Sequence, residues 1–235
     1  MRAMQRRAAR PSHRAGPTRR DWDANRVSRG DCCHCLTDTT PKMTAMDIRP
    51  LDRDVWPALA ELFAAGGDPR WCWCQWWRKR NANWTNTTAA DNRADLERLA
   101  ATEPAPGLVA LRDGRAIGWV GLGPREEFER LAHSRTIPQL PGDAVWTVNC
   151  FVVARDARRS GVAGALLRAA VAYAREHGAE LLEGYPVRTG GGKVTSAGLH
   201  TGSESMFEGE GFAVAAETTS GARAGTPRLV MRRDP

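Results

Sequence analysis

The sequence predicts an α/β (α+β) fold, because strand-like and helix-like segments alternate along the chain from Asp47 onward. Two further observations favour this fold. An Asp113-Gly114 pair between two apolar runs is a strong signal for a β-hairpin. A long β-branched run, residues 144–153, is followed by a glycine-containing turn and an apolar helical segment. The composition of the 235 residues, 42% hydrophobic and 26% charged, is that of a globular protein.

The positive charge is concentrated near the N-terminus. A net charge of +7 by itself suggests a nucleic-acid-binding protein. Residues 1–42, however, hold ten Lys or Arg and four Asp or Glu, so they carry six of the seven net charges. The remainder is nearly neutral, which speaks against nucleic acid as a partner of the folded part.

Residues 1–42 are expected to be a disordered, arginine-rich leader, since the first twenty contain seven arginines, no acidic residue and no apolar periodicity. Either they form a flexible tail, or the start was assigned too early, because Met43 and Met46 precede a strand-like stretch. Residues 43–235 are expected to form a single domain. The sequence has no secretory segment and no apolar run long enough for a membrane helix, which predicts a cytoplasmic protein without membrane contact.

The elements can be followed in order. A strand at 47–51 leads into a helix over 52–65, which has an apolar stripe and is ended by Gly66-Gly67. A second helix, a hairpin and a short helix follow at 89–101, 107–122 and 125–132. The central strand at 144–153 precedes a helix at 165–177, a strand at 180–185 and two last strands at 212–217 and 228–232.

The turn before the helix at 165–177 is a candidate phosphate site. A strand that runs into a glycine-containing turn and then a helix presents unpaired backbone N–H groups and the positive end of the helix dipole. The segment lacks both the Gly-Lys-Ser/Thr of a Walker loop and the G-x-G-x-x-G of a dinucleotide site. What it contains is Arg-x-x-Gly-x-Ala, formed by Arg158, Gly161 and Ala163.

With this motif, the sequence resembles the GNAT superfamily of acetyl-CoA-dependent N-acetyltransferases. A short amphipathic segment that closes on Gly211-Phe212 resembles the end of the family's fourth helix. The resemblance covers roughly residues 46–233. It implies a mixed, mostly antiparallel central sheet of six to seven strands flanked by helices, and acetyl-CoA as co-substrate.

The resemblance also implies which residues contact the coenzyme. The diphosphate would be bound mainly by main-chain amides of the turn, and Phe151, Val152 and Val153 would pair with the pantetheine arm as a strand does. Arg158 contributes to binding or is a solvated turn residue. The implied turn residues are Arg158, Arg159, Ser160, Gly161, Val162, Ala163 and Gly164.

The sequence departs from the family at the general acid. Many members carry a tyrosine where this chain has Phe207, which cannot donate a proton to the leaving thiolate. Tyr185 is the first-ranked replacement, expected opposite Val152 and Val153. His200, which stands where asparagine is common, is an alternative acid or coenzyme contact, although a solvated loop histidine explains it equally well.

The sequence does not single out the base that deprotonates the acceptor amine. Asn149 can orient a water but cannot hold the proton. Glu183 and the carboxylates of Glu126, Glu127 and Glu129 are candidates, and an amine that arrives neutral needs no protein base.

A tryptophan-rich segment, residues 70–78, is expected beside the acceptor cleft. Aromatic walls bind apolar, aromatic or cationic acceptors, but tryptophans equally often complete a core. We expect at least one of four to line the pocket: Trp71, Trp73, Trp76 and Trp77. Cys72 and Cys74 in this segment, and Cys32, Cys33 and Cys35 in the leader, lack the spacing of a metal site, so no metal is expected and the thiols should be reduced.

These observations lead to three functional hypotheses. The first is an N-acetyltransferase that moves an acetyl group from acetyl-CoA to an amine of a small molecule or protein. The second is a catalytically inactive acyl-CoA sensor of the same fold. The third, driven by the leader alone, is an RNA-interacting protein. A monomer and a homodimer both remain compatible with the sequence.

Overall fold

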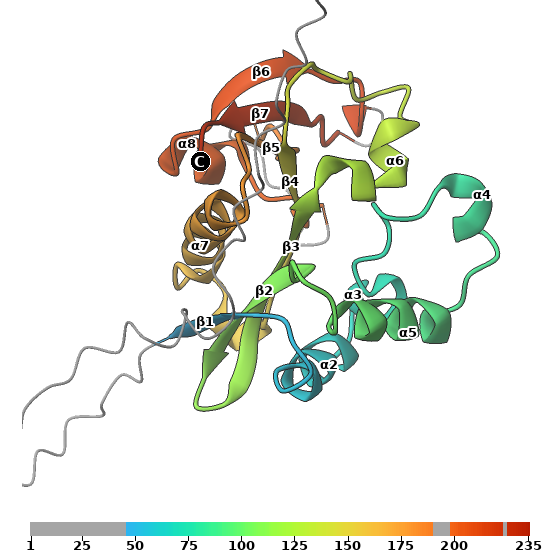
Figure 1. Ribbon diagram of the computed structural model, residues 1–235, viewed down its shortest axis with the longest axis vertical. Helices are drawn as coiled ribbons and strands as arrows, with labels where there is room; N and C mark the ends of the chain where they lie inside the picture. The colour runs from blue at the N-terminus through green and yellow to red at the C-terminus, as the bar shows by residue number, and fades with distance from the viewer. Residues whose placement is uncertain (1–45, 190–197, 223–224) are drawn as a thin grey trace, which may run out of the picture. The chain divides into compact units, whose positions relative to one another are not determined.

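Seven strands form one sheet in the order β1-β2-β3-β4-β5-β7-β6 in the computed structural model (Figure 1). All neighbours are antiparallel except β4 and β5, which run parallel. This confirms the mixed, mostly antiparallel sheet. The strands are β1 Asp47–Pro50, β2 Gly107–Arg112, β3 Arg115–Pro124, β4 Val145–Val153, β5 Leu181–Gly184, β6 Ala213–Glu217 and β7 Leu229–Arg233.

The structure describes residues 46–189, 198–222 and 225–235. They all belong to a unit that runs from Thr40 to Pro235. The predicted leader over 1–42 and its three cysteines lie outside the described residues, so the expectations about them remain predictions.

Most of the predicted helices are present, with several differences in their bounds. The predicted helix at 125–132 is divided into the 3-10 turn η2, Arg125–Glu127, and α6, Glu129–Ala132. Two short helices, α3 Pro69–Cys72 and α4 Asn81–Trp84, lie where no element was expected. α7, Val162–Glu176, starts three residues earlier than predicted, whereas α2, Trp56–Ala64, starts four residues later. The 3-10 turn η3, Arg155–Ala157, was not predicted, and the remaining helices are α5 Ala89–Leu99 and α8 Glu204–Gly209.

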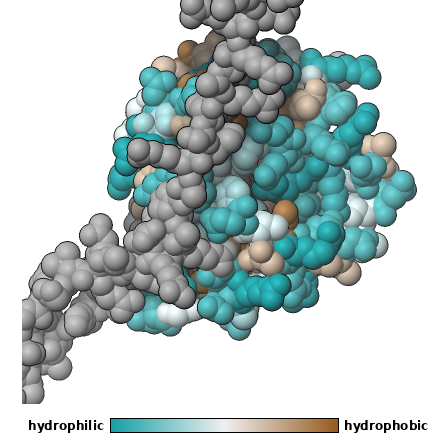
Figure 2. Space-filling model, in the orientation of Figure 1, coloured by the Kyte–Doolittle hydropathy of each residue, from teal (hydrophilic) through white to brown (hydrophobic). Residues whose placement is uncertain are grey.

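Helices cover both faces of the sheet, and the strands alternate accordingly. On β2, Leu108 and Ala110 pack with the α7 side chains, whereas Val109 and Leu111 pack with those of α2 and α5. Figure 1 shows α7 and α8 on one side of the sheet and α2 and α5 on the other. The coloured part of the face in Figure 2 is mainly hydrophilic, as expected for helices whose apolar side is buried. No helix among the described residues has the length and apolar content to cross a bilayer.

The two parallel strands diverge at one end. β4 and β5 pair only from Val145 and Leu181 to Val148 and Gly184. Further along β4, the N–H of Phe151 donates to the carbonyl of His200, with an N···O distance of 2.6 Å. Beyond Val148, therefore, the segment around His200 replaces β5 as the neighbour of β4.

Candidate active site

A cleft of about 1780 Å³ runs past the end of β4. Its walls come from the turn before α7, from α2 to α4, from α6 and the residues after it, and from the connection between β6 and β7. The predicted residues that line it are Phe151, Val152, Val153, Arg158, Arg159, Gly161, Val162, Ala163, Gly164, His200, Trp76 and Trp77. Five predicted residues are outside this lining: Asn149, Ser160, Tyr185, Trp71 and Trp73.

The turn between β4 and α7 has the geometry of an anion site. Gly161 caps α7 with φ +83°, in the left-handed region, and no side-chain cap bonds to the start of the helix within the described residues. A Cβ placed on Gly161 would meet no atom within 4 Å, so the space in front of these amides is open. A fifteen-residue helix with free N-terminal amides attracts a phosphate through those amides and its dipole.

The side chains of the turn support its backbone. The hydroxyl of Ser160 donates to the carbonyl of Ala157 at 2.7 Å, which explains why it does not face the cleft. Arg159 also has a left-handed backbone, with φ +60°. The Nε of Arg158 donates to the carbonyl of Val153 at 3.3 Å, so this arginine ties the turn back to β4.

The main chain of β4 is less available than the sequence suggested. The N–H of Phe151 is already bonded to His200, so Phe151 does not offer it to a pantetheine arm. Since strand residues alternate, Val153 is the next residue whose N–H points the same way. His200 itself lines the cleft, where a bound ligand could contact it.

Asn149 occupies a β-bulge. The register of β3 shifts between Gly121, opposite Cys150, and Leu122, opposite Val148, which leaves Asn149 as the additional residue of β4. Its Nδ2 is buried and has no hydrogen-bond partner among the described residues. Because Asn149 is not part of the cleft lining, this placement gives no support to the water-orienting role expected for it.

The position expected for Tyr185 is wrong. β5 ends at Gly184, which pairs with Val148, so Tyr185 does not lie opposite Val152 and Val153. β4 and β5 no longer pair beyond Val148 and Gly184.

Tyr185 belongs to a buried polar cluster behind the cleft. Its side chain is fully buried, its ring stacks on Trp77 at 5.8 Å between centroids, and its hydroxyl donates to the Glu183 carboxylate. Burial, with the charge of Glu183, raises the pKa of the Tyr185 phenol well above its usual value. The phenol is thus a structural hydrogen-bond donor in this placement.

None of the four candidate carboxylates lines the cleft. Glu183 is 2% exposed and pairs with Arg232 at 2.5 Å and with Arg125 at 3.5 Å. Glu127 pairs with Arg78 at 2.5 Å. These contacts make Glu183 and Glu127 partners of arginines, not bases beside the acceptor.

Phe207 fills the core under the end of β5. It is fully buried in α8, and its ring meets Phe151 and Phe212 edge-on at 6.2 and 4.9 Å. A Cβ on Gly184 would lie 2.1 Å from the ring, so only glycine fits beside it. No proton donor is present at this position of the fourth-helix motif.

The tryptophan segment is neither one strand nor one helix. α3 ends at Cys72, and the next two residues, Trp73 and Cys74, both have left-handed backbones with φ +43° and +53°. Trp73 is therefore turned into the core, with its ring 5.4 Å from that of Phe63, whereas Trp71 is 60% exposed. Neither of these two tryptophans lines the cleft.

Trp76 and Trp77 do line the cleft, as expected for at least one tryptophan. The guanidinium of Arg130 lies 3.6 Å from the centroid of the Trp76 ring, and Trp84 meets that ring edge-on at 5.0 Å. Trp77 is 5% exposed, and its Nε1 has no partner among the described residues.

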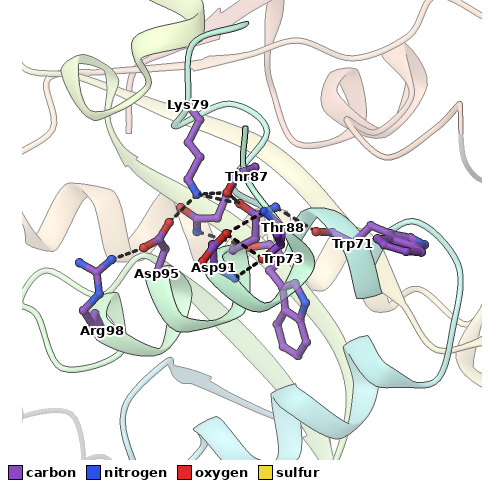
Figure 3. Close-up of polar contacts among 10 residues, drawn as sticks. Trp71, Trp73, Lys79, Thr87, Thr88, Asp91, Asp95 and Arg98 are labelled. Atoms are coloured by element: carbon purple, nitrogen blue, oxygen red, sulfur yellow. Dashed lines mark hydrogen bonds and ion pairs between the residues drawn. The ribbon is translucent and has the colours of Figure 1, made fainter. Parts of the chain in front are cut away.

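A lysine network holds this segment on α5 (Figure 3). The Nζ of Lys79 donates to Thr87 at 2.9 Å and to Asn92 at 2.8 Å, and pairs with Asp95 at 2.5 Å. Asn92 in turn donates to the carbonyl of Trp71 at 3.0 Å. These bonds fix the direction in which the segment enters the cleft.

Three thiols meet beside the cleft, from positions far apart in the sequence. The Sγ atoms of Cys74 and Cys150 are 2.7 Å apart, and the Nε1 of Trp119 donates to Cys74 at 3.1 Å. A hydrogen bond from Cys74 is the main cause that lowers the pKa of Cys72, whereas burial raises that of Cys74. No group of three His, Cys, Asp or Glu side chains is arranged to hold a metal ion in the part of the chain that the structure describes.

Several lining residues carried no signal in the sequence. Arg130 lies in α6 and His133 directly after it, and Arg228 and Ser220 lie in the connection between the last two strands. Only the fold brings them to the same cleft.

Comparison with known proteins agrees with this architecture. The sequence model of the Acetyltransferase (GNAT) family matches residues 71–186. No curated protein matches the sequence. A GCN5-related N-acetyltransferase from Kribbella flavida superimposes with a TM-score of 0.50 at 21% identity, over 81% of this chain and 98% of that one.

Two further solved structures have similar scores. An acetyltransferase of the GNAT family from Desulfovibrio desulfuricans has a TM-score of 0.50 at 17% identity, over 81% of this chain and 99% of that one. PaiA N-acetyltransferase from Thermoplasma acidophilum, in complex with coenzyme A, has a TM-score of 0.49 at 15% identity, over the same shares. The match of the family model, on the mostly antiparallel sheet described above, identifies residues 71–186 of this chain as a GNAT acetyltransferase domain.

Proposed function

We propose that the protein transfers an acetyl group from acetyl-CoA to an amine of a small molecule or a protein. The observation that supports this best is the left-handed Gly161 turn at the start of α7, which opens into the same cleft as Trp76 and Trp77. A phosphate-binding turn and an aromatic wall in one cleft suit a reaction between a nucleotide-bearing donor and a separate acceptor.

In this proposal, the free amides of Val162, Ala163 and Gly164 bind the diphosphate, and the charges of Arg158 and Arg159 attract it. Gly161 leaves the room that the phosphates need. Acetyl-CoA supplies an activated thioester. The lining residues at the end of β4, Val152 and Val153, would flank its pantetheine arm.

The acceptor nitrogen attacks the thioester carbonyl, the carbon–sulfur bond breaks, and the sulfur leaves with the electron pair. The proton lost by the amine must reach solvent or a nearby base. His200 and His133 are cleft residues that are able to exchange it. Phe207 has no proton for the sulfur, but a thiol of pKa ~8.5 leaves as an anion at modest cost near neutral pH.

The test is coenzyme binding by calorimetry. Gly161→Glu should abolish acetyl-CoA binding, since it puts a negative, bulky side chain where the phosphates belong. Gly161→Ala is the matched control: it has the same left-handed strain, about 1 kcal/mol, without charge or bulk, and should bind. Equal affinity of wild type and the Glu variant would remove the coenzyme assignment.

The alternative is an acyl-CoA sensor of the same fold. The buried Phe207, together with the absence of the four candidate carboxylates from the cleft lining, favours it. A sensor would bind acetyl-CoA and respond to Gly161→Glu in the same way, but no amine would accelerate release of free coenzyme A. A thiol-detection assay across a panel of amines distinguishes the two functions.

A further inference from the structure

One end of the cleft is lined by arginines. No ion pair within the described residues engages any of the four: Arg80, Arg130, Arg135 and Arg228. Other arginines near the site do have partners, as Arg78 does in Glu127. The helices that bring two of the four arginines to the cleft, α4 and α6, lie on the right of Figure 1, whereas α7 lies on the left.

The same end of the cleft has unused hydrogen-bond donors. The Nε1 of Trp77, the Nη2 of Arg130 and the Nε of Arg228 are buried without a partner in the described parts of the chain. Burial also lowers the pKa of both arginines. Each unpaired buried donor costs about 1–3 kcal/mol, so a ligand with acceptor oxygens would relieve that cost.

The acidic side chains of the cleft come from other elements. Glu61 belongs to α2, Asp68 precedes α3, and Asp156 in η3 pairs with Arg115 at 2.5 Å. No carboxylate from α4, α6 or the β6–β7 connection is in the lining. The arginine end therefore has a surplus of positive charge and of donors.

We propose that the acceptor is a small amine that also carries a carboxylate, held by Arg228 and its neighbouring arginines. The inference rests on the proposed acetyl transfer and specifies its acceptor. A guanidinium binds a carboxylate through two parallel N–H···O bonds, which would orient the amine of the same molecule toward the end of β4. Trp76, which is 38% exposed and lines the same cleft, would border its side chain.

The test compares α-amino acids with their amides. Coenzyme A release should be faster with the acid of each pair, because the amide keeps the amine and the side chain but loses the charge. Arg228→Gln should raise KM for the acid by roughly 10–100-fold, the effect of a hydrogen bond to a charged group, and leave KM for the amide unchanged. Arg175→Gln, an exposed change on α7 outside the cleft, is the matched control.

The outcomes separate the inference from the proposed function. Turnover that is equal for acids and amides, or insensitive to Arg228→Gln, overturns the inference and leaves acetyl transfer in place. If no amine releases coenzyme A, the inference is tested by binding instead. The quenching of tryptophan fluorescence by N-acetyl amino acids is then compared with the quenching by their amides. Preference for the acids supports a carboxylate site, and equal binding of both overturns it.

The three thiols carry a second, independent inference, because nothing in acetyl transfer uses them. Cys72 is half-buried on the cleft wall, Cys74 is buried next to it, and Cys150 contacts Cys74 from β4. We propose that this cluster is a site of reversible oxidation by a peroxide, with a disulfide between Cys74 and Cys150 as its product.

The steps balance in atoms and electrons. The Cys72 thiolate attacks the peroxide and becomes a sulfenic acid, with one water formed. Cys74 displaces a second water from that sulfur, and Cys150 then attacks Cys74 and releases the Cys72 thiol. In total, two thiols lose two electrons and two protons, and one hydrogen peroxide becomes two waters. The lowered pKa of Cys72 agrees with its place as the first nucleophile.

Peptide mapping under non-reducing conditions tests this on the full chain with Cys32, Cys33 and Cys35 changed to serine. Hydrogen peroxide should link Cys74 to Cys150, and a dithiol should reverse the link. Cys72→Ser should slow its formation about ten-fold, since the thiolate sets the rate. If both thiols remain open to alkylation after peroxide and denaturation, or if the rate is unchanged in Cys72→Ser, the inference fails.

Discussion

The removal of one hydroxyl, in Tyr185→Phe, distinguishes a structural tyrosine from a catalytic one. The phenol donates to the 2% exposed carboxylate of Glu183, and Arg125 and Arg232 continue to pair with that carboxylate in the variant. A hydrogen bond to a charged group contributes ~1.5–3 kcal/mol. For a domain of this size, about 2–4 °C accompany each kcal/mol, so the melting temperature should fall by roughly 3–12 °C.

Two measurements on the same protein check this. A thermal melt followed by tryptophan fluorescence gives the loss of stability, and coenzyme A release below the melting range gives turnover. We expect a lower melting temperature with turnover within about two-fold of wild type. A variant that melts like wild type but turns over ~10²-fold more slowly, as loss of a positioned proton donor would cause, refutes the structural reading.

Further predictions concern stability. Phe207→Tyr should lower the free energy of unfolding by ~1–3 kcal/mol in denaturant titrations, because its hydroxyl would be buried against Gly184 without a visible partner. Thr88→Ala removes the capping box of α5 and should cost ~0.5–2 kcal/mol in the same titrations. A fragment of residues 43–235 should melt within a few degrees of the full chain; loss of cooperative unfolding would contradict this. Above pH 10.0, the usual pKa of tyrosine, unfolding releases the Tyr185 proton, so stability should fall with rising pH more steeply in wild type than in Tyr185→Phe.

The sequence predicted those parts of the fold that depend on local patterns. The Asp113-Gly114 hairpin, the long β4 strand and the turn at Gly161 all have their signal within a few residues, and each was located to within three residues of its place in the structure. The left-handed backbone at Gly161 follows from the same logic, because glycine is the residue that adopts it without strain.

Local sequence patterns did not predict the backbone turn in the tryptophan segment or the contacts between distant segments. Two successive left-handed residues at Trp73 and Cys74 turned one tryptophan into the core, and no residue pattern announces such a turn. The separation of β4 from β5 was equally hidden, since it depends on the carbonyl of His200 reaching Phe151. The position expected for Tyr185 was wrong for this reason, because the register of two parallel strands, and not distance along the chain, decides where Tyr185 lies.

The residue at position 207 can change only together with its neighbours Gly184 and Gly202, which lie against the Phe207 ring. A Cβ on Gly184 would lie 2.1 Å from its ring, and a Cβ on Gly202, where φ is +85°, would lie 2.8 Å from the opposite edge. The three residues thus form one packing unit that joins β5, α8 and the segment that bonds to β4. A side chain can be introduced at 184 only when the ring at 207 becomes smaller, so substitutions here are acceptable in combinations and not one at a time. An attempt to restore a phenol at the fourth-helix position by design would therefore start with the backbone of its neighbours, before any question of proton transfer arises.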